Sequence, residues 1–257
     1  MKTLIYQVYV GDNSKLYDYC TASVRAYAER IGADYICQKE PILKIKPNPS
    51  TSNRSKEAVE RLGYLPIYEK ENAFDYLDRY DRIAIIDSDV WVRPEAPSIF
   101  SEVEDEVDFA AVVERDMPIT DQYMHKIINY SHMQYGQLIH IDFDKNNRGY
   151  EFMNMGVIVV NKSFLKYMEG MTAKQWLTQD EFAPFIDGRG AWKWSTDQTL
   201  LNAFIRYKKA KIQRLHWSWN GLYSVNTRLP ECNFVHFFLK SKLPENGENV
   251  NSLMENV

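Results

Sequence analysis

Two aspartates at the end of an apolar run are the residues of this sequence best suited to chemistry. The run reaches Ile86, stops at Asp87, Ser88 and Asp89, and then resumes. Alternate residues of an extended chain point to the same side, so both carboxylates lie on one face. Carboxylate oxygens are the ligands that hard divalent cations prefer. The spacing therefore predicts a metal site at a strand end, although the same short triplet also occurs in ordinary loops.

The elements around this run alternate between strands and helices. A strand over 3–10, a helix from about residue 16 to 31 between Ser14 and Gly32, and a strand over 33–37 form a βαβ unit. Such units have parallel strands and right-handed crossovers. Further strands are predicted over 107–113, 155–160, 211–215 and 234–238, and helices over 163–168 and 196–207. The class is therefore α/β, and ligands of such sheets bind beyond the carboxyl ends of the strands.

Other parts of the chain have less regular patterns. Residues 39–55 contain three prolines and read as a long loop, and a helical region over about 56–80 is interrupted at Pro66. Residues 115–150 read as an insertion over the site. Its histidines, His125, His132 and His140, are interpreted as surface residues because none has an i, i+4 partner. Residues 244–257 read as a polar tail.

Length and composition indicate one large domain over residues 1–257. With 45% hydrophobic residues the chain has enough apolar material for a full core. Within this domain we distinguish a first half over about residues 1–113 and a second half over about residues 114–243. A net charge of −4 with scattered basic residues argues against nucleic acid as a partner. No apolar run has the length of a membrane span or the pattern of a signal peptide, so we expect a soluble, cytoplasmic protein. The three separated cysteines suggest neither a disulfide framework nor a zinc site.

Five segments carry short motifs in a fixed order. They are Asp87-Ser88-Asp89 (D-x-D), Asn154-Met155-Gly156-Val157 (N-x-G-V), Asp197-Gln198-Thr199-Leu200-Leu201-Asn202 (D-Q-x-x-L-N), Trp219-Asn220 (aromatic-Asn) and His236 to Lys242 (H-x-x-G-x-x-K). Together they resemble the metal-dependent nucleotide-sugar glycosyltransferases of the GT-A fold, most closely family 8, which includes glycogenin, galactinol synthase and bacterial lipopolysaccharide galactosyltransferases. The resemblance covers most of residues 3–242. It departs from the family at Leu239, where glycine is usual, and at Leu243, where proline is usual.

The resemblance implies a single-domain GT-A fold, with a Rossmann-like, mainly parallel sheet flanked by helices. It also implies a UDP-sugar donor carrying glucose or galactose, a carbohydrate or other hydroxyl acceptor, and retention of configuration. Asp87, Asp89 and His236 would hold Mn²⁺ or Mg²⁺, and the imidazole favours Mn²⁺. Lys242 would neutralise the β-phosphate. The remaining implied contacts are Tyr9 and Asp12 for the base and ribose; Lys70, Ser88, Gly156, Trp219 and Asn220 for the donor; and Asn154, Asp197 and Gln198 around the sugar and its reacting carbon.

Simpler interpretations stand beside several of these assignments. Tyr9 is also consistent with a packed tyrosine, Lys70 with a solvated helix face and His236 with a strand-end histidine. Asp197 is also suited to a helix N-terminus, where an acid contributes ~0.5 kcal/mol. Of the tryptophans, Trp219 and then Trp194 are candidates for an acceptor platform, because aromatic faces stack on sugars.

Several further classes of protein share parts of this pattern. An Asp-nucleophile phosphatase is disfavoured because Trp91 stands where threonine or valine is required and because the motif lies far from the N-terminus. A nucleotide-sugar pyrophosphorylase would need a glycine-rich loop after the first strand, which this sequence lacks. A non-catalytic carbohydrate-binding protein of the same fold and an inverting transferase with Glu114 as base are both compatible with these residues.

Overall fold

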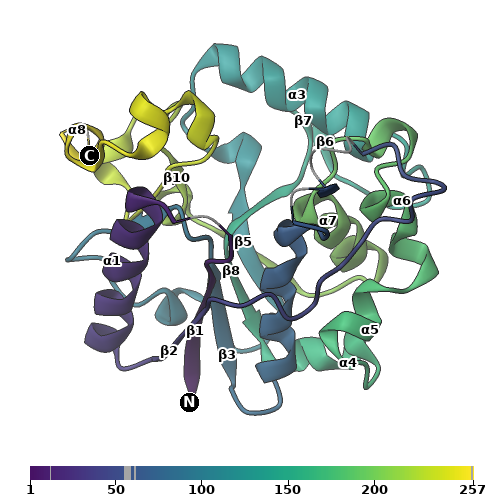
Figure 1. The fold of residues 1–257 in the computed structure, drawn as a ribbon, viewed down its shortest axis with the longest axis horizontal. Helices are drawn as coiled ribbons and strands as arrows, with labels where there is room; N and C mark the ends of the chain where they lie inside the picture. The colour runs from purple at the N-terminus through teal and green to yellow at the C-terminus, as the bar shows by residue number, and fades with distance from the viewer. Residues whose placement is uncertain (12, 55–58, 61, 256) are drawn as a thin grey trace.

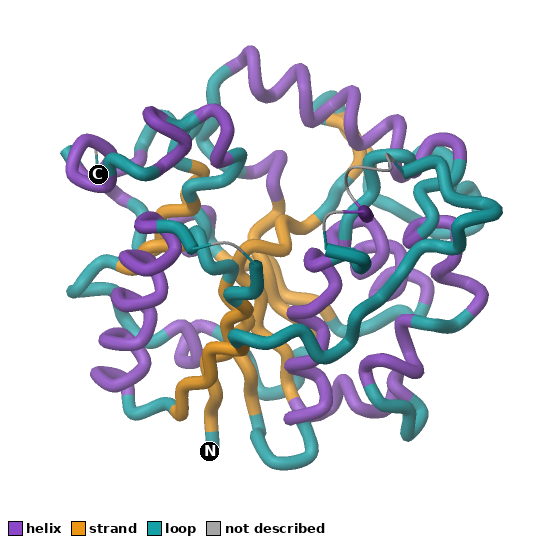
Figure 2. Tube along the Cα trace, in the orientation of Figure 1, coloured by secondary structure: helices purple, strands orange, loops and turns teal. Residues whose placement is uncertain are grey.

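A six-stranded sheet forms the centre of the computed structural model, which describes residues 1–11, 13–54, 59–60, 62–255 and 257 (Figures 1 and 2). The strand order is β2-β1-β3-β8-β5-β9. The strands are β1 (Thr3–Val8), β2 (Asp34–Gln38), β3 (Arg82–Ile86), β5 (Phe109–Val113), β8 (Met153–Asn161) and β9 (Ile212–Leu215). Of these six, only β8 runs antiparallel to its neighbours. The predicted α/β class with a mainly parallel sheet is confirmed.

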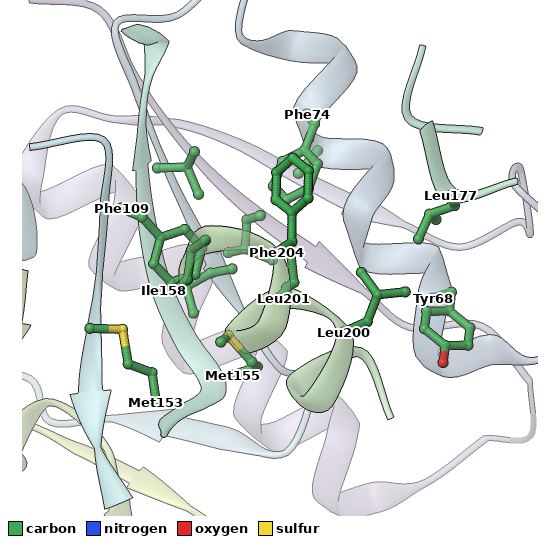
Figure 3. Close-up of a cluster of buried hydrophobic side chains, with 14 of the residues drawn as sticks. Tyr68, Phe74, Phe109, Met153, Met155, Ile158, Leu177, Leu200, Leu201 and Phe204 are labelled. Atoms are coloured by element: carbon green, nitrogen blue, oxygen red, sulfur yellow. The ribbon is translucent and has the colours of Figure 1, made fainter. Parts of the chain in front are cut away.

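Helices cover both faces of this sheet (Figure 1). On one face, Val24 and Ala28 of α1 (Lys15–Ile31) pack with Ile5 and Ala84 of the sheet. On the other face lie α7 (Asp197–Tyr207) and the long 3₁₀ helix η1 (Pro66–Tyr76). Figure 3 shows side chains of η1, β5, β8 and α7 in the core on this second side. Three short helices of the second half are α4 (Leu165–Met168), α5 (Ala173–Leu177) and α6 (Ala183–Ile186).

The reversed direction of β8 determines which residues reach the ligand edge of the sheet. Val157 pairs with Ile86 at the end of β3, and Asn154 pairs with Val112 near the end of β5. The register shifts between Ala111 and Val112, which marks a β-bulge. The first residues of β8 therefore lie beside the last residues of two parallel strands.

A second, three-stranded sheet continues from the end of β3. It consists of β10 (Gly221–Leu222), β11 (Phe234–His236) and β4 (Val90–Val92). Strand β11 runs antiparallel to β4, with His236 opposite Val90. This pairing places His236 next to Asp89, although 147 positions separate the two residues in the chain. A two-stranded ribbon, β6 (Lys145–Asn146) and β7 (Gly149–Tyr150), lies apart from both sheets.

Short 3₁₀ helices complete the part of the chain that the structure describes. They are η2 (Ile99–Glu102), η3 (Glu114–Asp116), η4 (Lys162–Phe164), η5 (Asp180–Phe182), η6 (Gly190–Trp192), η7 (Trp217–Trp219), η8 (Leu229–Glu231) and η9 (Lys240–Lys242). Among the described residues no helix is both long and apolar enough to pass through a bilayer.

The region over 115–150 contains a helix that the sequence did not predict. Helix α3 (Asp121–Tyr135) has fifteen residues and begins after Thr120, whose side chain accepts a hydrogen bond from the Tyr123 backbone N–H. Much of the helix is exposed, so its apolar periodicity is weak. The N-cap residue Thr120 was the one local feature of the sequence that indicated where this helix begins.

The prediction of a polar tail over 244–257 is wrong. The segment forms η10 (Pro244–Gly247) and α8 (Val250–Met254), and Leu253 is fully buried in a cluster with Leu16 and Cys20 of α1. Glu248 accepts a hydrogen bond from the backbone N–H of Lys15 at 3.2 Å. A single buried leucine in a polar segment produces no periodic pattern, which is why the sequence did not indicate this packing.

Candidate active site

A cavity of ≈ 430 Å³ opens at the carboxyl ends of β1 and β3. This is the edge at which parallel sheets bind their ligands. Residues of six parts of the chain line it: Val8, Val10 and Gly11 at and after the end of β1; Tyr17 of α1; Leu62, Pro66, Ile67 and Lys70 in and before η1; Asp87, Ser88 and Asp89 after β3; Asp197 of α7; and Lys240 of η9. The cavity brings together the predicted residues Lys70, Asp87, Ser88, Asp89 and Asp197.

The three predicted metal ligands lie together: Asp87 and Asp89 line the cavity, and the buried His236 lies beside Asp89. One ligand atom from each of Asp87, Asp89 and His236 lies within 4.8 Å of the other two, and no other such cluster occurs among the described residues. The imidazole Nε2 of His236 is 3.2 Å from Asp89 Oδ1. Two carboxylate oxygens and an imidazole nitrogen form a donor set that fits Mn²⁺.

The contact between Asp89 and His236 shifts the pKa values of both groups. Burial disfavours the ionised form of Asp89, but His236 beside it outweighs this effect and lowers the pKa of Asp89. Burial also disfavours the imidazolium form of His236, yet the Asp89 carboxylate raises the pKa of His236 overall. The site thus stabilises positive charge at the position where a cation would be held.

Lys70 links two carboxylates at the floor of the cavity. Its Nζ lies 2.8 Å from Asp87 Oδ1 and 2.9 Å from Asp197 Oδ2, and it donates to the Met155 carbonyl at 2.8 Å. Burial opposes the ammonium charge, but the carboxylates of Asp197 and Asp87 raise the pKa of Lys70 overall. Burial raises the pKa of Asp197, and Lys70 partly offsets this shift. Lys70 therefore holds the N-terminus of α7 against the metal strand.

A chain of side-chain hydrogen bonds lies behind the metal trio. His236 Nδ1 is 3.0 Å from Asn220 Oδ1, and Asn220 Nδ2 donates to Asn154 Oδ1 at 2.7 Å. Asn154 Nδ2 donates to Glu114 Oε2 at 3.0 Å, and Tyr123 donates to Glu114 Oε1 at 2.8 Å. Burial raises the pKa of Glu114. Three residues considered for the site thus lie in a buried layer and do not line the cavity: Asn154, predicted as a catalytic residue beside the sugar; Asn220, predicted as a donor contact; and Glu114, considered as a base.

Gly156 is required because the imidazole ring lies against its backbone. A Cβ at this position would lie 2.3 Å from His236 Cε1 and 2.5 Å from His236 Nδ1. Contacts this short do not occur, so any larger residue would displace the ring. The glycine predicted as a donor contact has a steric role toward the metal ligand.

Tyr9 and Asp12 were predicted to contact the nucleotide. The Tyr9 hydroxyl accepts a hydrogen bond from the Ser14 backbone N–H at 2.7 Å, and the Lys39 ammonium lies 3.7 Å from its ring centroid. The ring is buried and does not line the cavity, whereas Tyr17 does. Asp12 lies outside the described residues.

Lys240, rather than Lys242, lines the cavity. Lys242 is exposed, so the structure does not support its predicted position at the diphosphate. Lys240 Nζ donates to Ser14 Oγ at 2.8 Å and lies 2.9 Å from Glu248 Oε1. Leu239 has φ 57 and ψ 58, the left-handed conformation that glycine adopts readily. The backbone at Leu239 thus takes a conformation suited to glycine, and the lysine at the cavity lies two residues before the predicted one.

The remaining predicted residues lie away from the cavity wall. Trp219 is buried and packs edge-to-face on Phe234 with ring centroids 5.3 Å apart, which makes it a core residue rather than a sugar platform. Gln198 Oε1 accepts from the Met155 backbone N–H at 3.3 Å. Trp194 is 64% exposed.

The sequence did not predict Tyr17 or Lys240 as cavity residues. Tyr17 lies in the first turn of the helix that follows β1, a place where α/β proteins often contact ligands. Lys240 follows a residue with a positive φ, and no motif indicated that the chain turns there.

No family model matches this chain, and neither does any curated protein. Solved structures do match it over nearly its full length. A glycosyltransferase involved in glycosylation of the major capsid of PBCV-1 is 13% identical, with a TM-score of 0.58, and covers 99% of this chain and 100% of its own. The galactosyltransferase LgtC, solved with donor and acceptor sugar analogs, is 12% identical, with a TM-score of 0.54, and covers 98% and 94%. Mouse xyloside xylosyltransferase 1 is 11% identical, with a TM-score of 0.52, and covers 95% and 100%.

These likenesses, together with the sheet and the position of the cavity, define the class of fold. The chain has the fold of the GT-A glycosyltransferases, as the sequence motifs predicted.

Proposed function

We propose that this protein is a metal-dependent glycosyltransferase. It moves a hexosyl group, glucose or galactose, from a UDP-sugar to a hydroxyl group of an acceptor, with retention of configuration. The observation that carries the proposal is that Asp87 and Asp89, with His236 beside them, adjoin the Lys70–Asp197 pair, and that both aspartates and this pair line one cavity. The solved structures of the same fold are named as glycosyltransferases, which supports the proposal.

The donor binds at the trio and its surroundings. Asp87, Asp89 and His236 hold the divalent cation, which stabilises the charge of the nucleoside diphosphate leaving group. Lys240 carries a positive charge on the cavity wall and is suited to a phosphate oxygen. Its neighbours Ser14 and Glu248 hold the ammonium group in the absence of a donor.

Asp197 is the residue assigned to the sugar. The carboxylates among the described residues of the cavity wall are Asp87, Asp89 and Asp197, and the first two are metal ligands in this proposal. Asp197 is held by Lys70, so its role is to orient the sugar hydroxyls and to stabilise positive charge at C1. An inverting enzyme needs a free carboxylate as base, whereas retention at the front face can use the departing phosphate.

Incubation with UDP-glucose or UDP-galactose, Mn²⁺ and a panel of carbohydrate acceptors with free hydroxyl groups, followed by assay of released UDP, tests the activity. Asp197→Asn should lower turnover by roughly 100-fold, because a preorganised charge is lost, while UDP affinity changes little. Asp121→Asn is the matched control, since Asp121 is likewise a first-turn aspartate of a helix. NMR of the first product gives its configuration. A β-linked product from an α-linked donor would exclude retention, and no UDP release with either donor would contradict the proposed substrate.

A further inference from the structure

The hydrogen-bond donors on the cavity wall differ in whether they are already paired. The ammonium group of Lys70 lies between two carboxylates, at 2.8 and 2.9 Å, and that of Lys240 lies 2.9 Å from a carboxylate oxygen of Glu248. Tyr17 lines the same cavity, and within the described part of the chain no group forms a hydrogen bond with its hydroxyl. The wall thus presents a phenol hydroxyl that is free to bind a ligand.

Two neighbours hold the ring of Tyr17 in place. The ring of Tyr9 packs against it at an interplanar angle of 85°, with the ring centroids 5.5 Å apart. The ammonium group of Lys240 lies 5.1 Å from the centroid of the Tyr17 ring, within the distance at which a cation is attracted to an aromatic face. These contacts engage the ring but not the hydroxyl, so the polar end of the side chain is the part that a ligand can reach.

The Tyr17 side chain lies near the two aspartates that follow β3. Burial, and after it the carboxylates of Asp89 and Asp87, raise the pKa of Tyr17. The hydroxyl therefore stays protonated at neutral pH and can donate a hydrogen bond. Phosphate oxygens are strong acceptors, and a diphosphate bound at these aspartates would lie on the same part of the wall as this donor.

We propose that Tyr17 is a substrate-binding residue, whose hydroxyl donates a hydrogen bond to a phosphate oxygen of the sugar donor beside the ammonium group of Lys240. The inference rests on the proposed function and adds a residue that none of the five sequence motifs contains. A hydrogen bond to a charged acceptor contributes more to binding than one to a neutral acceptor. Because the phosphates carry this charge and the nucleoside does not, Tyr17 favours a nucleoside diphosphate over the nucleoside alone.

The variant Tyr17→Phe removes the hydroxyl and keeps the ring that packs against Tyr9 and Lys240. With Mn²⁺ present, it should bind UDP about 10-fold more weakly than the wild-type protein, because a hydrogen bond to a charged group is lost. Its affinity for uridine, which has no phosphate, should stay within about twofold of wild type. Calorimetric titration measures both affinities. Tyr19→Phe is the matched control and should bind both ligands as wild type does, since Tyr19 lies in the same helix, is 41% exposed and does not line the cavity.

Two results would assign the hydroxyl to another task and overturn the proposal. If Tyr17→Phe lost as much affinity for uridine as for UDP, Tyr17 would contact the nucleoside rather than the phosphates. Mn²⁺ binding without nucleotide, measured by electron paramagnetic resonance of free Mn²⁺, should be the same in Tyr17→Phe and wild type. If it fell as much as the affinity for UDP, the hydroxyl would support the metal ligands instead.

Failure of this inference and failure of the proposed function give different results. If the wild-type protein binds UDP with Mn²⁺ and Tyr17→Phe binds it equally well, only the role of Tyr17 is overturned. If the wild-type protein binds no UDP with Mn²⁺, the proposed donor site is overturned and the role of Tyr17 with it.

Discussion

Lys70 illustrates how one buried charge stabilises two others. It lies within 2.9 Å of both Asp87 and Asp197, and all three groups face the cavity. Truncating one partner of a buried ion pair is costly because it leaves the other charge unpaired. An ion pair on the surface contributes little to stability, so removing one of its partners costs little.

Lys70→Met should therefore lower the free energy of unfolding by about 3 kcal/mol. The double variant Lys70→Met/Asp197→Asn should recover part of this loss, since one of the two uncompensated carboxylates is then neutral. Denaturant unfolding measures both effects. Lys126→Met on the exposed face of α3 is the control and should change stability by less than about 0.5 kcal/mol. Equal stability of the Lys70 and Lys126 variants would contradict the assigned ion pairs.

Leu239 adopts a conformation that disfavours its own side chain. A left-handed backbone costs an L-residue about 1–2 kcal/mol, and Leu239, at φ 57 and 47% exposed, has little packing to offset this cost. Leu239→Gly should raise the free energy of unfolding by about 0.5–1 kcal/mol, after allowance for the greater freedom of glycine in the unfolded chain. Leu165→Gly is the control, because Leu165 has φ −54 and should be destabilised. Destabilisation of both variants would indicate that Leu239 is not strained.

At the scale of elements, Asp108 connects three segments of the chain. Its carboxylate accepts hydrogen bonds from Ser163, Lys166, Tyr167 and the backbone N–H of Lys211. Burial opposes ionisation, but these donors, led by Lys166, lower the pKa of Asp108 from 3.8 to about 2. Asp108 thus joins the start of β5 to α4 and to the residue before β9.

This pKa shift predicts a pH dependence of stability. Because the folded-state pKa is depressed, the stabilisation is fully present above pH 3.8 and is lost as the pH falls toward 2. Asp108→Asn should therefore cost on the order of 2 kcal/mol at pH 7 and progressively less as the pH falls below about 4. Unfolding free energies of both proteins from pH 7 to pH 3 measure the difference. A difference that stays constant over this range would show that the carboxylate charge is not the cause.

The elements also show which parts of the structure a sequence can predict. Strands β3, β5 and β8 were predicted because buried strands are continuous apolar runs, which stand out in any sequence. Helix α3 and α8 were missed because one is largely exposed and the other buries a single leucine. Asp87, Asp89 and His236 were predicted from motifs, and the β4–β11 pairing explains why they meet.

Other site predictions depended on backbone path, which spacing alone does not specify. Lys242 has the spacing of the family's phosphate lysine, yet the turn at Leu239 places Lys240 at the cavity. Tyr9 directly follows β1, where a nucleotide contact was predicted, but its ring packs against the Lys39 ammonium group instead of lining the cavity. Asn154 and Asn220 were predicted as site residues, but the hydrogen bonds that connect them to His236 could be seen only in the side-chain geometry.

At the scale of the whole molecule, one reversed strand explains how the site is assembled. Strands β1 and β3 end at the cavity. Strand β8 runs in the opposite direction, so its beginning lies next to the end of β3, where the Met155 carbonyl accepts a hydrogen bond from Lys70. Helix α7 contributes Asp197, and the second sheet contributes His236. Ligand binding should therefore stabilise the entire domain, since groups from both halves of the chain contact one cavity.

Thermal unfolding with UDP, in the presence of Mn²⁺ or of EDTA, tests the proposed metal-dependent donor site most directly. UDP at about 100 times its dissociation constant should stabilise the wild-type protein by ~2.7 kcal/mol when Mn²⁺ is present. In EDTA, and in Asp89→Asn with Mn²⁺, this stabilisation should be absent, while Asp121→Asn should behave like wild type. Equal stabilisation by UDP in Mn²⁺ and in EDTA would contradict the metal-dependent donor site, and no stabilisation in either would contradict nucleotide binding itself.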